Sequence, residues 1–225
     1  IIGRGGVGMD NIDVDYAKSK GINVINTPAA SSKSVAELVF SHLFGCVRFL
    51  HESNRSMPLD GDSKFKELKK AYAGGKELAG KKIGIIGFGR IGQEVAKIAI
   101  GIGMNVIFYD KFIEQTSFDI KFFDGQNISF NLVSSTFDEV LENSDFISLH
   151  IPASDKYIID SKEIGKMKDG VGLLNLSRGG IVNEEELLKS INIGKVSFAG
   201  IDTFENEPVP TMKLLMNSNI SLTPH

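Results

Sequence analysis

A run of glycines between two apolar segments gives the first indication of chemistry. Gly87, Gly89 and Gly92 form a Gly-x-Gly-x-x-Gly pattern that follows the apolar segment Lys82–Ile86 and precedes the apolar-periodic stretch Ile91–Ile102. A glycine loop between a strand and a helix lets backbone approach a pyrophosphate, and the helix N-terminus adds free N–H groups. The pattern therefore predicts a dinucleotide site. The alternative, a tight turn in an unrelated α/β protein, is disfavoured by the flanking elements.

A carboxylate stands at the end of the next strand of the same unit. Asp110 follows the apolar segment Asn105–Tyr109, on the far side of the helix that leaves the glycine loop. An acid at this point can accept hydrogen bonds from both ribose hydroxyls and would repel a 2′-phosphate. Asp110 therefore favours NAD over NADP as the cofactor, and Lys111 beside it weakens that preference slightly.

Three further polar residues, Arg178, Glu207 and His225, follow the ends of other predicted strands. Hydride transfer to a carbonyl needs a proton donor, a group that tunes the donor and a cation that holds the substrate carboxylate. In an open parallel sheet such groups lie just beyond the carboxyl ends of the strands. Taken singly, each residue is more often a solvated surface residue. Together, beside a nucleotide loop, they indicate a catalytic set.

The remaining histidines fit other roles. His150-Ile151-Pro152 also ends a predicted strand, but a proton donor there has no obvious carboxylate partner, so we expect these residues to line the cofactor pocket. His42 and His51 fall on an amphipathic helix and are expected to be structural or exposed. The histidines and the single cysteine show no paired ligand spacing, so no metal site is predicted.

Alternating strands and helices must position these residues. The predicted strands are Ile83–Ile86, Asn105–Tyr109, Phe146–His150, Gly170–Asn175, Ser197–Ile201 and Ile220–Leu222, and the predicted helices are Ile91–Ile102, Phe137–Glu142, Ser161–Lys166 and Glu184–Ser190. Short apolar strands that alternate with helices are typical of a parallel sheet covered on both faces. We therefore predict an α/β fold with a doubly wound, Rossmann-like sheet.

The other segments carry weaker signals. Apolar residues at helical spacing predict one amphipathic helix over Ser34–Glu52, which Ser34 or a neighbouring serine could cap. Residues 55–75 are expected to form an exposed arm or loop, and residues 112–135 to be irregular, with a possible hairpin at Asp124-Gly125. The start of the chain predicts the end of a buried strand at Ile1–Arg4, a glycine turn, a helix at Val14–Lys20 and a strand at Asn23–Ile25.

Composition narrows the class of protein. The net charge is −3 with both signs well mixed, so no nucleic-acid footprint or membrane-seeking basic face is expected. No apolar run reaches about 18 residues, so no spanning helix is expected. The single cysteine, Cys46, excludes an intrachain disulfide framework and fits a reducing compartment, which predicts a cytoplasmic protein.

Six ordered motifs resemble those of the D-isomer-specific 2-hydroxyacid dehydrogenases. They are Gly3–Asp13, Asn26-Thr27-Pro28, Gly84–Gly92, Asn175–Gly180, Asp202–Pro208 and Thr223-Pro224-His225. The resemblance covers almost the whole chain and is weakest in 55–75 and 112–135. It is greatest to the members that oxidise D-3-phosphoglycerate to 3-phosphohydroxypyruvate with NAD, at the entry to serine biosynthesis. Another D-2-hydroxyacid dehydrogenase, acting on hydroxypyruvate, glyoxylate or D-lactate, and a non-catalytic NAD-binding regulator remain alternatives.

The resemblance implies a role for each motif residue. Arg178 would hold the carboxylate and carbonyl oxygen of a small 2-hydroxy acid substrate, His225 would exchange the proton of its C2 hydroxyl, and Glu207 would hydrogen-bond His225. The backbone of Gly6, Val7 and Gly8 would meet the substrate carboxylate. Cofactor contacts would come from Arg90, Ile91, Asp110, Ile151, Leu176 and Asp202, with Asp202 facing the nicotinamide carboxamide.

The resemblance also implies a domain organisation. Residues 1–26 would be the last fragment of a smaller, flavodoxin-like substrate domain, 26–28 a hinge, and 27–225 the NAD-binding domain. Both ends of the chain would then be cut inside a longer protein. Family members associate through the helix that begins near Ser34, so a homodimer or higher homo-oligomer is expected.

Overall fold

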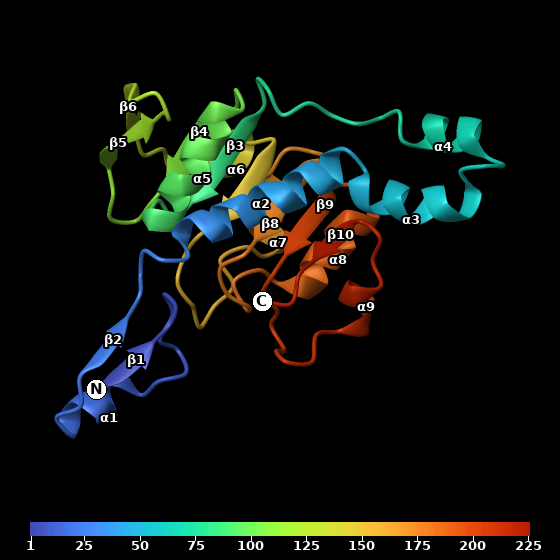
Figure 1. The fold of residues 1–225 in the computed structure, drawn as a ribbon. Coiled ribbons are helices and arrows are strands. Elements are labelled where there is room, and N and C mark those ends of the chain that lie inside the picture. The colour runs from blue at the N-terminus through green and yellow to red at the C-terminus, as the bar shows by residue number, and fades with distance from the viewer.

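A six-stranded parallel sheet forms the centre of the structure, a computed structural model that describes all 225 residues (Figure 1). Its strands, in spatial order, are β10 (Ile220–Leu222), β9 (Val196–Ile201), β8 (Val171–Asn175), β7 (Phe146–Leu149), β3 (Lys82–Ile86) and β4 (Asn105–Tyr109). The chain runs from β3 to β4 on one side and then returns to β7 on the other. This reversal opens a crevice beyond the carboxyl ends of β3 and β7. The predicted doubly wound α/β sheet is confirmed.

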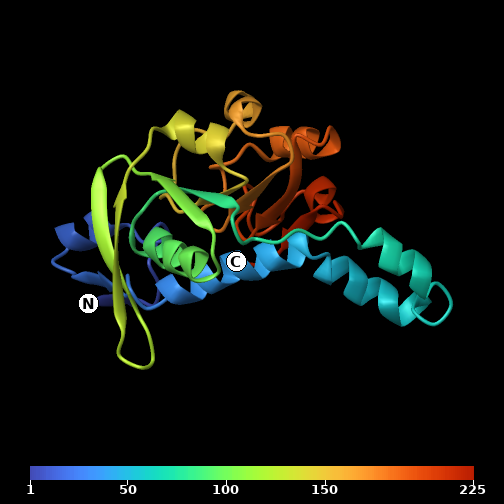
Figure 2. The same ribbon diagram turned by 90° about the horizontal axis from the view of Figure 1, so that it is seen from above.

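Helices cover both faces of the sheet, as Figure 2 shows from above. On one face, α2 (Ser32–Val47) and α5 (Arg90–Gly101) pack on Ile83 and Ile85 of β3. On the other face, α6 (Phe137–Asn143), α7 (Ser161–Lys166), α8 (Glu184–Asn192) and the short α9 (Met212–Leu215) share a core with Ile86. Neighbouring strand residues point to opposite faces, so each strand contributes to both cores. Most predicted bounds agree to within one or two residues, but α9 was not predicted. None of the helices is both long and apolar enough to cross a membrane.

The first 26 residues form a separate small layer. Strands β1 (Ile2–Arg4) and β2 (Val24–Asn26) pair in parallel around α1 (Val14–Ser19) and join no strand of the large sheet. The prediction of a buried strand at the start of the chain is wrong for this structure, because all three residues of β1 are exposed. Only α1 and β2 are present to pack against that strand, and Ile25 of β2 is also 59% exposed.

An exposed helical arm follows α2. The prediction of a single helix to Glu52 is wrong, because α2 ends at Val47 and Phe49 adopts a left-handed conformation with φ 54°. Two short helices, α3 (Leu50–Asp60) and α4 (Phe65–Ala71), then form an arm with no buried residue. The predicted exposed arm is confirmed, but it is helical rather than a loop. The serine prediction also fails: Ser34 lies inside α2, and Ser31 at the N-cap makes no side-chain capping bond.

A β-hairpin occupies the segment that was expected to be irregular. Strands β5 (Gln115–Lys121) and β6 (Asn127–Val133) pair antiparallel, with Phe118 opposite Phe130. The hairpin predicted at Asp124-Gly125 is confirmed, and Gly125 takes the positive φ of 87° that its turn requires. The hairpin packs against the domain because Phe118 is buried and contacts the ring of Phe88 in the glycine loop.

Candidate active site

The three glycines of the loop have different surroundings. A Cβ on Gly87, which has φ 90°, would collide with the carbonyl of His150, and a Cβ on Gly92 would collide with the carbonyl of Gly87. Both glycines therefore allow close backbone packing beneath the loop. A Cβ on Gly89 would meet nothing within 4 Å, and Gly89 is the N-cap residue of α5. The loop thus presents an open cradle at a helix N-terminus, which fits a pyrophosphate group.

Asp110 fastens this loop to the end of β4. Its carboxylate accepts backbone N–H bonds from Phe88 at 2.7 Å, Phe112 at 2.8 Å and Ile113 at 3.1 Å. The ring of Phe88 also stacks on Phe108 of β4, with centroids 3.9 Å apart. The predicted carboxylate therefore lies next to the glycine loop, and its contact with a ribose stays a prediction.

A cleft of about 1000 Å³ opens between the carboxyl edge of the sheet and the N-terminal layer. Most predicted site residues line it. They are Val7, Gly8, Gly89, Arg90, Ile91, His150, Ile151, Pro152, Leu176, Arg178, Asp202, Glu207 and His225. Gly87 and Gly92 lie beneath the loop, Asp110 lies behind it, and Gly6 lies beside the guanidinium of Arg4. Residues up to about 220 positions apart in the chain thus converge on one space, as expected for the edge of a parallel sheet.

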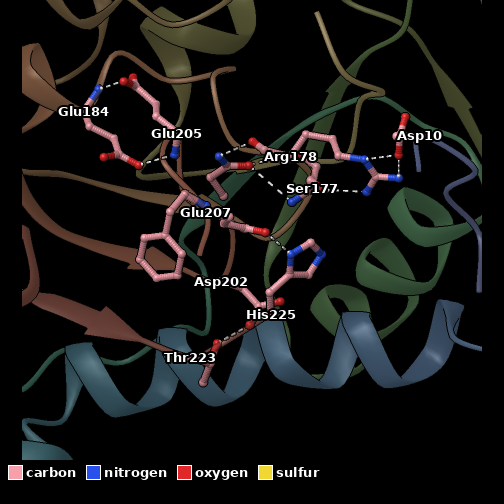
Figure 3. Close-up of polar contacts among 11 residues, drawn as sticks. Asp10, Ser177, Arg178, Glu184, Asp202, Glu205, Glu207, Thr223 and His225 are labelled. Carbon is pink, nitrogen blue, oxygen red and sulfur yellow. Dashed lines mark hydrogen bonds and ion pairs between the residues drawn. The ribbon is translucent and has the colours of Figure 1, made fainter. Parts of the chain in front are cut away.

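His225 and Glu207 form a hydrogen-bonded pair in this cleft (Figure 3). Nδ1 of His225 lies 2.8 Å from Oε2 of Glu207, and the backbone N–H of Phe204 donates to Oε1 at 2.9 Å. Burial opposes the charge of Glu207, but the bonds from His225 and Phe204, with the nearby charges of His225 and Arg178, hold its pKa below the ordinary value. The carboxylate is therefore ionised at neutral pH and accepts a hydrogen bond from Nδ1–H. Nε2 is then the ring nitrogen left for another partner.

Arg178 is clamped from two sides. Its Nε and Nη2 donate to Oδ2 of Asp10 at 3.0 and 2.9 Å, and its Nη1 donates to the carbonyl of Ser177 at 2.7 Å (Figure 3). A side chain on Gly8 would collide with Nη2, so that glycine admits the guanidinium. Asp10 belongs to the Gly3–Asp13 motif, but no role was predicted for it. Its contact with Arg178 could not be predicted from spacing, because 168 positions separate the two residues. The guanidinium thus already binds a carboxylate in this structure.

His150 has no carboxylate partner, in agreement with its assignment to the pocket wall. Nε2 lies 2.8 Å from Oγ of Ser148, whereas Nδ1 is enclosed without a partner. Burial lowers the pKa of His150 to about 3, so the imidazole is neutral at pH 7. An imidazole ring that stays neutral at every pH near 7 exchanges protons poorly as a general acid or base. This environment differs from that of His225.

The chain is similar in sequence to known proteins of one family. The family model described as "D-isomer specific 2-hydroxyacid dehydrogenase, NAD binding domain" matches residues 40–225. The chain is 45% identical to a hydroxypyruvate reductase of Thermotoga maritima over its whole length and 69% of that protein. It is 39% identical to a D-3-phosphoglycerate dehydrogenase of Methanocaldococcus jannaschii, of which it covers 41%.

Solved structures agree on the fold. A glyoxylate reductase from Paecilomyes thermophila matches all of the chain and 65% of its own, with a TM-score of 0.78 and 33% identity. A D-lactate dehydrogenase from Aquifex aeolicus, complexed with NAD and lactic acid, matches 97% of the chain and 67% of its own, with a TM-score of 0.73 and 33% identity. The chain therefore spans between about two-fifths and two-thirds of these four relatives.

The glycine loop allows a test that separates cofactor binding from folding. Gly89→Ala should leave thermal stability nearly unchanged, because a Cβ meets nothing there, but should weaken NADH binding at least about ten-fold by filling the cradle. Gly92→Ala should instead lower the melting temperature, since its Cβ collides with backbone. Calorimetric titration with NADH and a thermal melt of each variant measure both effects. Normal NADH affinity in the Gly89 variant would contradict the assignment of the loop.

Proposed function

Because the chain belongs to the D-isomer specific 2-hydroxyacid dehydrogenases and carries their NAD-binding domain, we propose that the protein interconverts a D-2-hydroxy acid and a 2-oxo acid with NAD. The observation that carries the proposal is that Arg178, Glu207 and His225 line one cleft with the glycine loop. Bound NAD supplies the hydride acceptor for the C2 hydrogen. The protein then has to bind the acid, orient C2 and move one proton.

His225 would move that proton. Ionised Glu207 accepts the hydrogen bond from Nδ1, which leaves Nε2 to take the hydroxyl proton during oxidation and to return it during reduction. The negative charge of Glu207 stabilises the imidazolium that forms, and the second bond, from Phe204, keeps the carboxylate in place. This division between a proton carrier and an orienting carboxylate supports the predicted roles.

Arg178 would hold the substrate. In the structure the guanidinium pairs with the carboxylate of Asp10, and this observation supports the proposal that it binds a carboxylate ligand. A substrate carboxylate could share that charge, with the backbone of Val7 and Gly8 lining the same part of the cleft. The carbonyl oxygen would then lie between Arg178 and His225. Fixing both ends of a small acid in this way places C2 in one orientation.

The cofactor residues divide along the cleft. Gly89, Arg90 and Ile91 would hold the pyrophosphate at the start of α5, and Asp110 would meet the adenosine ribose. His150-Ile151-Pro152 and Leu176 would form the walls. Asp202, which follows β9 and faces the same cleft, would accept a hydrogen bond from the nicotinamide carboxamide. Residues 1–26 would be the remnant of the substrate domain, since they form a layer apart from the large sheet.

For the substrate, we propose D-3-phosphoglycerate, which would place the protein in serine biosynthesis in the cytoplasm. Relatives named D-3-phosphoglycerate dehydrogenase, at 38–40% identity, support this choice, whereas the hydroxypyruvate reductase at 45% supports the unphosphorylated acid. Both share a three-carbon glycerate skeleton. Of the arginines that could meet a 3-phosphate, Arg4 lines the cleft, whereas Arg48 lies beside Gly75 at the base of the arm and Arg55 on α3.

Substitution of Arg4 tests whether the protein binds the phosphorylated or the unphosphorylated acid. In the whole protein, Arg4→Met should raise the KM for D-3-phosphoglycerate about 10- to 100-fold, the size of a lost charge-assisted bond, and change that for D-glycerate little. Arg48→Met, outside the cleft, is the matched control. An equal rise in KM for both acids would contradict a role of Arg4 in phosphate binding. Wild-type turnover of D-glycerate without turnover of D-3-phosphoglycerate would overturn the substrate proposal.

The proton-transfer role is tested by His225→Asn. The variant should lower kcat about 10²- to 10⁴-fold, the usual contribution of a positioned acid or base, and leave NADH affinity within about two-fold. Lys162→Asn, on the exposed side of α7, serves as control. A steady-state turnover assay measures kcat, and a fluorescence titration measures the affinity for NADH. Full activity in the His225 variant would contradict the proton-transfer role of His225. A wild-type protein that binds NADH but turns over no substrate would favour the alternative, a non-catalytic NAD-binding regulator.

We also propose that the protein forms homodimers through the helical arm. The arm exposes Leu50, Met57, Leu59 and Phe65 by 43–78%, although such apolar surface is normally covered. Its base is closed by a hydrogen bond from Lys76 N–H to the carbonyl of Val47. Figure 2 shows the arm projecting from the domain, on the side away from the β5–β6 hairpin.

A deletion tests this dimer. Replacing Leu50–Tyr72 by two glycines should halve the molar mass measured by light scattering, because the deletion removes the apolar surface of the arm. The rest of the domain should still fold, because the Val47–Lys76 bond keeps the two ends of the deletion close together. Lys70→Glu on the same arm is a control that removes no apolar surface. NADH binding should persist in the shortened protein. An unchanged dimer mass after deletion would place the interface elsewhere.

A further inference from the structure

A buried histidine connects α2 with the cleft from behind the sheet. His42 is 3% exposed, and its side chain packs over Gly200 of β9. A Cβ on Gly200 would lie 2.9 Å from the Cβ of His42 and 3.2 Å from its Cγ. Any larger residue at position 200 would push the imidazole away. The strand therefore leaves room for this ring in particular.

Both ring nitrogens of His42 have hydroxyl partners on the segment that leads to His225. Nδ1 lies 2.7 Å from Oγ of Ser221, and Nε2 lies 3.0 Å from Oγ1 of Thr223. The Thr223 hydroxyl in turn donates its hydrogen to Oδ1 of Asp202, as the dashed line in Figure 3 marks. His42 thus reaches a carboxylate of the cleft through one intervening hydroxyl.

The donor and acceptor roles in this chain are fixed. Thr223 has one hydroxyl hydrogen, which it gives to Asp202, so its oxygen accepts from His42. Nε2 must then carry the hydrogen, and in the neutral ring Nδ1 accepts from Ser221. Burial lowers the pKa of His42, against the opposing effect of the Asp202 charge, which favours the neutral ring. Aligned bonds of this kind strengthen one another in a buried setting.

We propose that His42 is a positioning residue for the nicotinamide end of the cofactor. Acting through Thr223, it holds one oxygen of Asp202, so that the other is directed to the carboxamide in the cleft. The inference rests on the role proposed above for Asp202. Because His42 lies behind the sheet and lines no part of the cleft, it would act on the cofactor only through this chain of bonds.

Two ligands separate positioning from folding. ADP-ribose has the adenosine and pyrophosphate of NADH but no nicotinamide, so it does not need Asp202. In the 225-residue chain, His42→Leu should weaken NADH binding about ten-fold, the upper end of the loss expected for one buried hydrogen bond between neutral groups. ADP-ribose affinity should change less than about two-fold. Calorimetric titration of both ligands measures the difference, and a thermal melt confirms that the variant is folded.

Three further variants make the test specific. Ser221→Ala breaks the other bond of His42 but not the path to Asp202, so its effect on NADH should stay below about three-fold. Thr223→Val should reproduce His42→Leu, and the double variant should be no worse than either single one, because both break the same chain. His42→Gln keeps an N–H donor near the position of Nε2 and should restore most of the NADH affinity.

The outcomes separate this inference from the proposed function. Equal losses for NADH and ADP-ribose would give His42 a structural role and overturn the inference, as would no loss for either ligand. If Asp202→Ala weakens NADH selectively and His42→Leu does not, the His42 inference alone fails. If Asp202→Ala binds both ligands normally, the proposed role of Asp202 fails and the inference with it.

Discussion

All six strands of the central sheet run in the same direction, and the rest of the structure depends on that constraint. Their carboxyl ends lie at one edge, so the residues that follow the strands gather in or next to the same crevice. Gly87 follows β3, Asp110 follows β4, His150 follows β7, Asp202 follows β9 and His225 follows β10. Parallel pairing in turn requires helices on both faces, which buries the strands and makes them apolar. The same constraint therefore supplies the core and assembles the site.

Within the crevice, hydrogen-bond partners decide what each ionisable group can do. Asp110 and Glu207 accept backbone N–H bonds, which fix the carboxylates in place. Two histidines of the crevice and one behind the sheet lie in three environments. His225 has a carboxylate partner, His150 has a single hydroxyl, and His42 has a hydroxyl on each nitrogen. Only the first arrangement stabilises a charged imidazolium, so residue type alone would not have separated their roles.

Sequence reasoning succeeded where a pattern was local and failed where a contact was not. The strand, glycine loop and helix at Lys82–Gly101 were predictable because apolar periodicity and turn residues lie next to one another. The helices of the arm were missed because their few apolar residues, none of them buried here, do not recur at a clear helical spacing. The Asp10–Arg178 pair and the bonds of His42 join positions 168–181 apart, which no spacing rule relates. The fold was thus largely predictable, but the partners that orient the site residues were not.

The central claim, that this cleft carries direct hydride transfer between a D-2-hydroxy acid and NAD, is tested most directly by isotope transfer. The whole protein would be given NAD and D-glycerate or D-3-phosphoglycerate deuterated at C2, and the NADH formed would be analysed by mass spectrometry. Direct transfer predicts one deuterium in each NADH from the D acid and no turnover of the L acid. Unlabelled NADH, with the deuterium released to water, would contradict the account.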